Sequence, residues 1–282
     1  MLINHLKIKQ LFCIAFFVLA VNHLYAQEKT KLVILHTNDT HSQVEATDMT
    51  APRPDMGGYA RRMGIIEQIR KEEAQVLLVD AGDYWQGTPY FNFFNGRIEI
   101  DAMNRMKYDA ATLGNHEFDN GVDTLAAVLS MAEFPVLCSN YDVSATQLSG
   151  MLKPYLLVEK GGVKIGLFAL CINPQGLIMA ANYRGIIYND PLQTAVEMSS
   201  FLKKDKKCDV IVCLSHLGVA KHAVNDFDIA RATQFVDVII GGHSHELIEN
   251  TTEPNAGGKP VVIAQMGKSG LYLGRIDLWL EK

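Results

Sequence analysis

Eight short apolar runs recur along the chain, and each of them ends in polar residues. They are rich in Val, Ile and Leu and lie at 31–39 (KLVILHTND), 75–83 (QVLLVDAGD), 108–116 (YDAATLGNH), 134–140 (FPVLCSN), 163–171 (VKIGLFALC), 208–216 (CDVIVCLSH), 236–245 (VDVIIGGHSH) and 259–267 (KPVVIAQMG). Runs of this length and composition are typical of strands buried on both faces. A chain with so many buried strands needs other elements to cover its sheets.

Helical patterns lie between several of these runs. The segments 57–74, 119–133 and 190–206 carry apolar residues at helical spacing. Strands that alternate with helices predict an α/β fold in which the helices cover the sheets. The closing stretch 269–282 alternates apolar and polar residues, which indicates a last strand or hairpin in a more antiparallel region.

The N-terminal segment has the pattern of an export signal. Two lysines precede an uncharged apolar run from Leu11 to Val21, and Ala26 stands at a suitable cleavage position. The run is too short to span a bilayer, which needs about 20 apolar residues. We therefore expect a signal peptide at 1–26, a mature domain at 27–282 without a membrane span, and a periplasmic or extracellular location. An uncleaved N-terminal anchor is the alternative.

The acidic balance of the mature segment excludes nucleic-acid polymers as partners. The chain has 26 Lys and Arg against 31 Asp and Glu, and two of the lysines belong to the signal, which leaves 24 and a net charge of −7. No basic patch is then available to replace phosphate counterions.

The four cysteines of the mature segment are Cys138, Cys171, Cys208 and Cys213. No two of them have the spacing of a metal or redox motif. Export would permit disulfides, but most of these cysteines lie in or beside apolar runs, so we expect buried free thiols.

The polar residues after the apolar runs are the candidate functional site. In open α/β sheets, ligands gather beyond the carboxyl ends of the strands. Five of the runs bring possible metal ligands to that position, and these residues are Asp39, His41, Asp83, Asn115, His116, His216, His243 and His245.

Each of these motifs alone has an ordinary explanation as a turn, but the set does not. Of the nine histidines, His5 and His23 belong to the signal and His36 lies inside a strand pattern. Five of the remaining six follow a strand end, and only His222 does not. Such clustering indicates a metal site.

The ligand types indicate which metals suit the site. Imidazoles mixed with carboxylates and one amide, without cysteine, suit Zn²⁺, Mn²⁺ or Fe and differ from a closed structural zinc site. These candidates exceed what one tetrahedral ion can use. We therefore expect two divalent metal ions bridged by one carboxylate, a device used for in-line displacement at phosphorus.

The motifs VILHTNDTH, DAGDYWQGT, LGNHEFDNG, SHLG and GGHSH resemble, in order and spacing, those of the calcineurin-like metallophosphoesterases. They are most similar to the branch of 5′-nucleotidases, UDP-sugar hydrolases and 2′,3′-cyclic phosphodiesterases. The resemblance implies a four-layer αββα sandwich of two mixed sheets flanked by helices. It also implies two ligand sets: Asp39, His41, Asp83 and His245 for one metal, and Asp83, Asn115, His216 and His243 for the other.

The resemblance implies hydrolysis of the phosphate monoester of a nucleotide by attack of a metal-bridging hydroxide. Asn115 and His116 would contact the phosphate, and His116 would donate a hydrogen bond to the transition state or a proton to the leaving group. Asp119 is placed to orient His116, although a helix N-cap is the alternative role. We expect Glu117 to be structural.

Members of this branch usually continue into a second domain that binds the nucleobase, and this chain stops at Lys282, where that domain would be joined. The expected substrate is a small nucleotide or phosphoester, and a separately encoded C-terminal-type nucleotide-binding domain is a candidate partner. Two alternatives stay open. The same centre would serve a cyclic-nucleotide phosphodiesterase or UDP-sugar pyrophosphatase, or the chain is a subunit that is inactive until a separate substrate-binding chain is bound.

Overall fold

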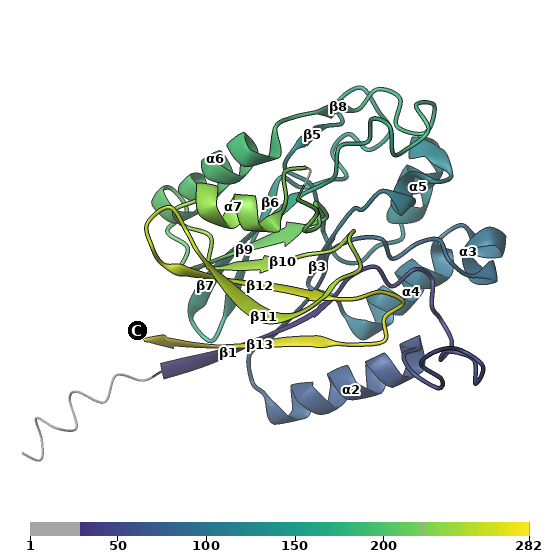
Figure 1. Ribbon diagram of the computed structural model, residues 1–282, viewed down its shortest axis with the longest axis horizontal. Coiled ribbons are helices and arrows are strands. Elements are labelled where there is room, and N and C mark those ends of the chain that lie inside the picture. Colours follow the sequence, from purple (N-terminus) through teal and green to yellow (C-terminus); the bar gives the residue numbers. More distant parts are fainter. Residues whose placement is uncertain (1–28, 222, 282) are drawn as a thin grey trace, which may run out of the picture.

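The computed structural model describes residues 29–221 and 223–281, and it contains two large mixed β-sheets between two layers of helices (Figure 1). The signal peptide expected at 1–26 lies outside the described residues. The four-layer α/β architecture predicted from the sequence is confirmed.

Sheet 1 has the strand order β13-β1-β2-β3-β4. Strands β1 to β4 are parallel to their neighbours, and β13 pairs antiparallel with β1, as the alternation of the closing stretch predicts. The strands are β1 (Lys29–Thr37), β2 (Val76–Asp80), β3 (Ala110–Thr112), β4 (Val136–Leu137) and β13 (Gly274–Glu281).

Sheet 2 has the order β11-β12-β10-β9-β7-β6, with parallel pairing at its centre and an antiparallel strand at each edge. Its strands are β6 (Tyr155–Lys160), β7 (Val163–Leu170), β9 (Val210–Ser215), β10 (Val238–Ile240), β11 (Leu247–Pro254) and β12 (Pro260–Met266). A small separate sheet pairs β5 (Tyr141–Asp142) with β8 (Ile187–Tyr188).

The helices cover the outer faces of the two sheets, with α2 on one side and α6 and α7 on the other (Figure 1). The first group packs on sheet 1 and contains α2 (Tyr59–Glu72), α3 (Pro89–Phe94), α4 (Arg97–Met106) and α5 (Gly121–Leu129). The second group packs on sheet 2 and contains α6 (Pro191–Lys204) and α7 (Asp226–Ala232). A short 3₁₀ turn, η1 (His116–Phe118), precedes α5. None of the described helices has the length and apolarity needed to cross a membrane.

Besides the apolar contacts between each sheet and its helices, a separate apolar cluster fills the space between the two sheets. It joins β1 residues such as Leu32 and Ile34 to β9 residues such as Val212 and Leu214. The central strands are therefore buried on both faces, which explains why the sequence shows continuous apolar runs there and not alternation. This core fixes the distance between the sheets and hence between the loops that leave them.

His36 is a polar exception in this core. Its side chain is fully buried, and neither ring nitrogen has a hydrogen-bond partner. The ring lies over Gly274, its pairing partner on β13, where any side chain would collide with the imidazole. Burial lowers the pKa of His36 to about 3. The folded protein therefore holds a neutral imidazole at pH values where the unfolded chain is protonated.

Replacing His36 with Leu should reduce the loss of stability in acid. Below pH 6.5 the imidazole of His36 is protonated in the unfolded chain, whereas in the folded protein it stays neutral down to about pH 3. The wild-type protein therefore loses stability as the pH falls through this window. Between pH 7 and 5 the variant should lose about 2 kcal/mol less of its free energy of unfolding. Urea titrations of both proteins at both pH values measure this, because the other histidines titrate alike in the two proteins. Equal losses would contradict the assignment.

Candidate metal centre

The seven predicted ligands come together at one end of the molecule, and both sheets contribute. Parallel strands of a sheet place the residues that follow them at the same edge. Sheet 1 contributes the residues that follow β1, β2 and β3, and sheet 2 contributes those that follow β9 and β10. In chain order these residues are Asp39, His41, Asp83, Asn115, His216, His243 and His245.

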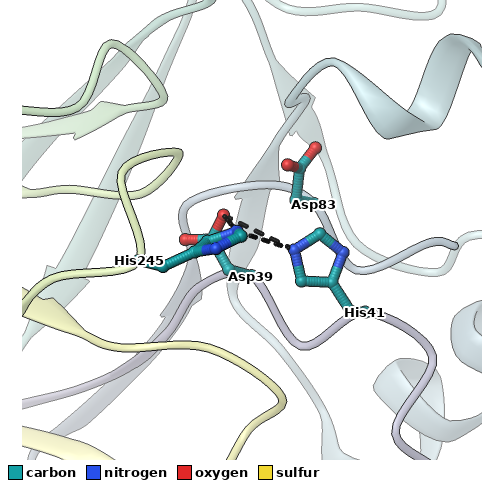
Figure 2. Close-up of side chains that lie close together, drawn as sticks. All are labelled: Asp39, His41, Asp83 and His245. Atoms are coloured by element: carbon teal, nitrogen blue, oxygen red, sulfur yellow. Dashed lines mark hydrogen bonds and ion pairs between the residues drawn. The ribbon is translucent and has the colours of Figure 1, made fainter. Parts of the chain in front are cut away.

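The first group consists of Asp39, His41, Asp83 and His245, each with a ligand atom within 4.8 Å of those of the others (Figure 2). His41 Nε2 lies 2.9 Å from His245 Nε2, and His245 Nε2 lies 3.4 Å from Asp39 Oδ1. His41 Nδ1 faces the Trp85 carbonyl oxygen at 3.3 Å, which fixes that nitrogen as the donor and leaves a lone pair on Nε2. The converging lone pairs form a candidate metal-binding site.

The second group consists of Asp83, His216 and His243, so Asp83 belongs to both. His216 donates from Nδ1 to the Ala81 carbonyl at 2.7 Å, which leaves Nε2 to face Asp83 Oδ2 at 3.1 Å. Asn115 adds an amide oxygen 3.0 Å from His243 Nδ1. His216 Nε2 is fully buried and makes no hydrogen bond of good geometry. A buried nitrogen of this kind fits a metal ligand.

Burial and charge set the protonation of these histidines. Burial lowers the pKa of His41, and burial together with the charge of His216 lowers that of His243 to about 4. Both rings are thus neutral near pH 7, as a metal requires. Burial alone would also lower the pKa of His216, but the adjacent Asp83 carboxylate outweighs it and raises that pKa well above 6.5. Metal binding would displace this proton.

Five of the seven predicted ligands have a backbone in the left-handed region. The φ angles are 47° at Asp39, 46° at His41, 56° at Asp83, 70° at His243 and 58° at His245. Each such conformation costs about 1–3 kcal/mol for a residue other than glycine and persists only where the surroundings impose it. Here Gly82 O and Asp83 O accept hydrogen bonds from the backbone N–H groups of Asp39 and His41.

The loop after β3 passes very close to the other ligand loops. A Cβ on Gly114 would overlap Asp83 Oδ1 and lie 2.5 Å from His216 Nε2. The close approach of the backbone at Gly114 therefore allows the Asp83 and His216 side chains to meet.

His116 and Asp119 form a pair beside the two groups and belong to neither. His116 Nδ1 lies 2.9 Å from Asp119 Oδ2, and both side chains are about one-third exposed, at 31% and 35%. Burial opposes protonation of His116, yet the hydrogen bond with Asp119 and the charge of Asp83 raise its pKa above 6.5. The N-cap of α5 is Asn120, and the side chain of Asp119 pairs with His116.

Glu117 has more contacts with the site than its sequence position suggests. It is fully buried, and its Oε2 accepts hydrogen bonds from the backbone N–H groups of Asp83 at 3.0 Å and Gly114 at 2.6 Å. Its Oε1 accepts one from Trp85 N–H at 3.1 Å. Burial and the Asp83 charge raise the pKa of Glu117 to about 8. Glu117 thus connects the loop after β2, which carries Asp83, to the loop after β3, which carries Gly114 and Asn115. The sequence pattern does not reveal this role.

Comparison with known proteins agrees with this arrangement. Residues 32–247 match the family model described as calcineurin-like phosphoesterase, and the chain belongs to this family. It is 33% identical to human 5′-nucleotidase over 89% of its own length and 47% of the relative, and 31% identical to the trifunctional nucleotide phosphoesterase protein YfkN of Bacillus subtilis over 89% and 18%.

Solved structures give the same result. A 5′-nucleotidase precursor from Thermus thermophilus superposes with a TM-score of 0.80 at 31% identity, over 89% of this chain and 54% of that one. The chain spans half or less of the length of the curated relatives that it matches. These comparisons therefore support the family and the fold of this chain.

Substituting Gly114 with Ala should weaken metal binding. The added methyl group would push Asp83 and His216 apart, so we expect a loss of at least tenfold in metal affinity, measured by titration calorimetry. Gly64→Ala is the matched control, because a Cβ at Gly64 in α2 meets no atom within 4 Å. That control should bind metal normally and be slightly more stable. Normal metal binding by Gly114→Ala would disprove the steric argument.

Replacing Glu117 with Gln should weaken metal binding by about ten- to a hundredfold. The amide presents an NH₂ group to at least one of three backbone N–H donors, so the Asp83 loop or the Gly114 loop must move. Metal affinity and melting temperature measure the effect. Glu72→Gln, at an exposed position on α2, is the control and should change neither quantity. An unchanged affinity in Glu117→Gln would show that the three bonds do not position the ligands.

Proposed function

We propose that the chain is a dinuclear-metal phosphomonoesterase of 5′-nucleotidase type. The observation that carries the proposal is the pair of ligand groups that share Asp83 next to the His116–Asp119 pair. Asp39, His41, Asp83 and His245 would hold one divalent ion, and Asp83, Asn115, His216 and His243 the other. Zn²⁺, Mn²⁺ and Fe²⁺ all suit this mixture of nitrogen and oxygen ligands.

The bound ions would supply a nucleophile derived from water at neutral pH and would neutralise charge on the phosphate. The residues of the chain position the reaction. Asn115 and His116 face the phosphate, and the raised pKa of His116 makes it a suitable proton donor to the departing oxygen near pH 7. Asp119 keeps Nδ1 of His116 engaged, so Nε2 is the nitrogen that faces the substrate.

The surface beside this pair suits a polar leaving group. A cleft of about 580 Å³ begins at Asn120, next to Asp119, and extends to Arg184. Its described lining also includes Asp123, Thr124, Thr146 and Gln147, and it contains no aromatic side chain. A nucleoside would find hydrogen-bond partners there but no ring on which its base could stack. We propose that the core acts on the phosphate group, and a separately encoded C-terminal-type nucleotide-binding domain is a candidate partner for base selection.

A second candidate activity is hydrolysis of phosphodiesters such as cyclic nucleotides or of UDP-sugars. The trifunctional nucleotide phosphoesterase of Bacillus subtilis, at 31% identity, favours keeping this alternative.

Export to the periplasm or the extracellular space is also part of the proposal. It is supported by the signal pattern at 1–26 and by the similarity to venom 5′-nucleotidases, such as that of Crotalus adamanteus at 34% identity.

Turnover of 5′-AMP, a cyclic nucleotide, UDP-glucose and an aryl phosphate by the metal-loaded protein tests the proposal. We expect 5′-AMP to be hydrolysed fastest, and His116→Asn to lose on the order of 10²-fold in kcat while retaining both metals. Asp119→Asn should lose less and also retain both metals. Metal content measured by mass spectrometry separates catalytic loss from ligand loss. Preference for UDP-glucose would favour the second candidate. Turnover only after a second chain is added would mean that the core is an inactive subunit on its own.

A further inference from the structure

Two buried cysteines from different sheets lie next to each other. Cys138 directly follows β4 at the edge of sheet 1, and Cys171 directly follows β7 of sheet 2. Their Sγ atoms are 3.2 Å apart. Residues 33 positions apart in the chain are thus brought together by the packing of the two sheets, a proximity that their sequence spacing does not reveal.

The backbone around these cysteines is held by contacts that do not involve sulfur. Ser139 N–H donates to the Ala169 carbonyl at 2.9 Å. The side chain of Asn140 accepts from the Cys171 N–H and donates to the Cys171 carbonyl, both at 2.8 Å. A disulfide bond is about 2.05 Å long, so each sulfur would need to move by about 0.6 Å. The hydrogen bonds of Ser139 and of the Asn140 side chain to the Cys171 backbone involve no sulfur, so a shift of the sulfur atoms alone leaves them in place.

The other two cysteines provide a contrast within the same chain. Cys208 and Cys213 are also buried, but within the described residues neither has a sulfur contact with another cysteine. Cys208 lies against Gly166, where a Cβ would be 2.8 Å from its sulfur, and Cys213 packs in the cluster between sheet 2 and its helices. Burial therefore does not by itself bring cysteines together in this fold.

We propose that Cys138 and Cys171 form a disulfide bond that joins the two sheets when the chain folds in an oxidising compartment. The two thiols lose two protons and two electrons, and the electrons reduce an exchangeable disulfide of a small molecule or an oxidoreductase to two thiols. The reaction passes through a mixed disulfide on one cysteine, which the second cysteine then resolves. Because both sulfurs are buried in the folded chain, this exchange takes place before the sheets finish packing.

The bond would lie close to the metal centre. Cys171 Sγ lies 3.6 Å from Thr112 Oγ1, and Thr112 ends β3, the strand whose loop leads to Asn115. The cross-link would restrict the separation of the sheets at this end of the molecule. Closing a loop of roughly 30 residues lowers the entropy of the unfolded chain, so the melting temperature should rise by about 5 to 10 °C.

The covalent state can be measured directly on the full chain. The protein is refolded with oxidised and reduced glutathione, unfolded, and alkylated with and without prior reduction. The unreduced sample should carry two fewer alkyl groups than the reduced sample. Proteolysis should yield the peptide containing Cys138 joined to the peptide containing Cys171. Equal alkylation of the two samples, or a bond between any other two cysteines, would overturn the proposal.

Variants separate this pair from the other thiols. In Cys138→Ala and in Cys171→Ala, the reduced and unreduced samples should carry equal numbers of alkyl groups. Reduction should also no longer lower the melting temperature of either variant. Cys208→Ala and Cys213→Ala are the matched controls and should retain both. If the first two variants fail to fold, the peptide map of the wild-type chain still decides the question. These measurements are independent of phosphoesterase activity, so an inactive protein leaves them interpretable.

Discussion

The contact between Asp83 and His216 is the constraint on which the site depends. Asp83 leaves sheet 1 and His216 leaves sheet 2, and their side chains meet at 3.1 Å in a place without solvent. Each side chain would be unstable there without the other, since burial of a charge requires a partner. The apolar core between the sheets brings the two strand ends together, and the absence of a side chain at Gly114 leaves them room. Packing far from the site thus sets its geometry.

Much of this arrangement could be predicted from the sequence, for a specific physical reason. A strand buried on both faces appears as an uninterrupted apolar run, and the first polar residues after it mark the strand end. The runs that end at Asp39, Asp83 and His216 show both features clearly. The ligands of one sheet could be predicted to lie together without knowledge of the strand order, because parallel strands bring their carboxyl ends to the same edge of a sheet in any order.

Other features were hidden because they depend on contacts between distant segments. Strand β11 is largely exposed and polar, so it lacks the apolar run that reveals its neighbours. The role of Glu117 follows from three backbone N–H groups that only the folded loops present to it. The proximity of Cys138 to Cys171 likewise depends on two sheets facing each other. The left-handed backbone at five predicted ligands could not be predicted, because a sequence usually indicates that conformation by glycine, which adopts it without strain, and these positions hold Asp or His.

The division of the predicted ligands between the two sheets affects the order of events in folding. In synthesis the residues from Asp39 to Asn115 emerge well before His243 and His245, which follow β10. A growing or partly folded chain can therefore offer a metal only an incomplete set of ligands. Pairing of strands so distant in sequence is slow because long loops must close first. Tight metal binding would then be a late step in folding. Until that step, the ligands from Asp39 to Asn115 would bind a metal ion only weakly and would exchange it, so the choice between different metal ions would be made late.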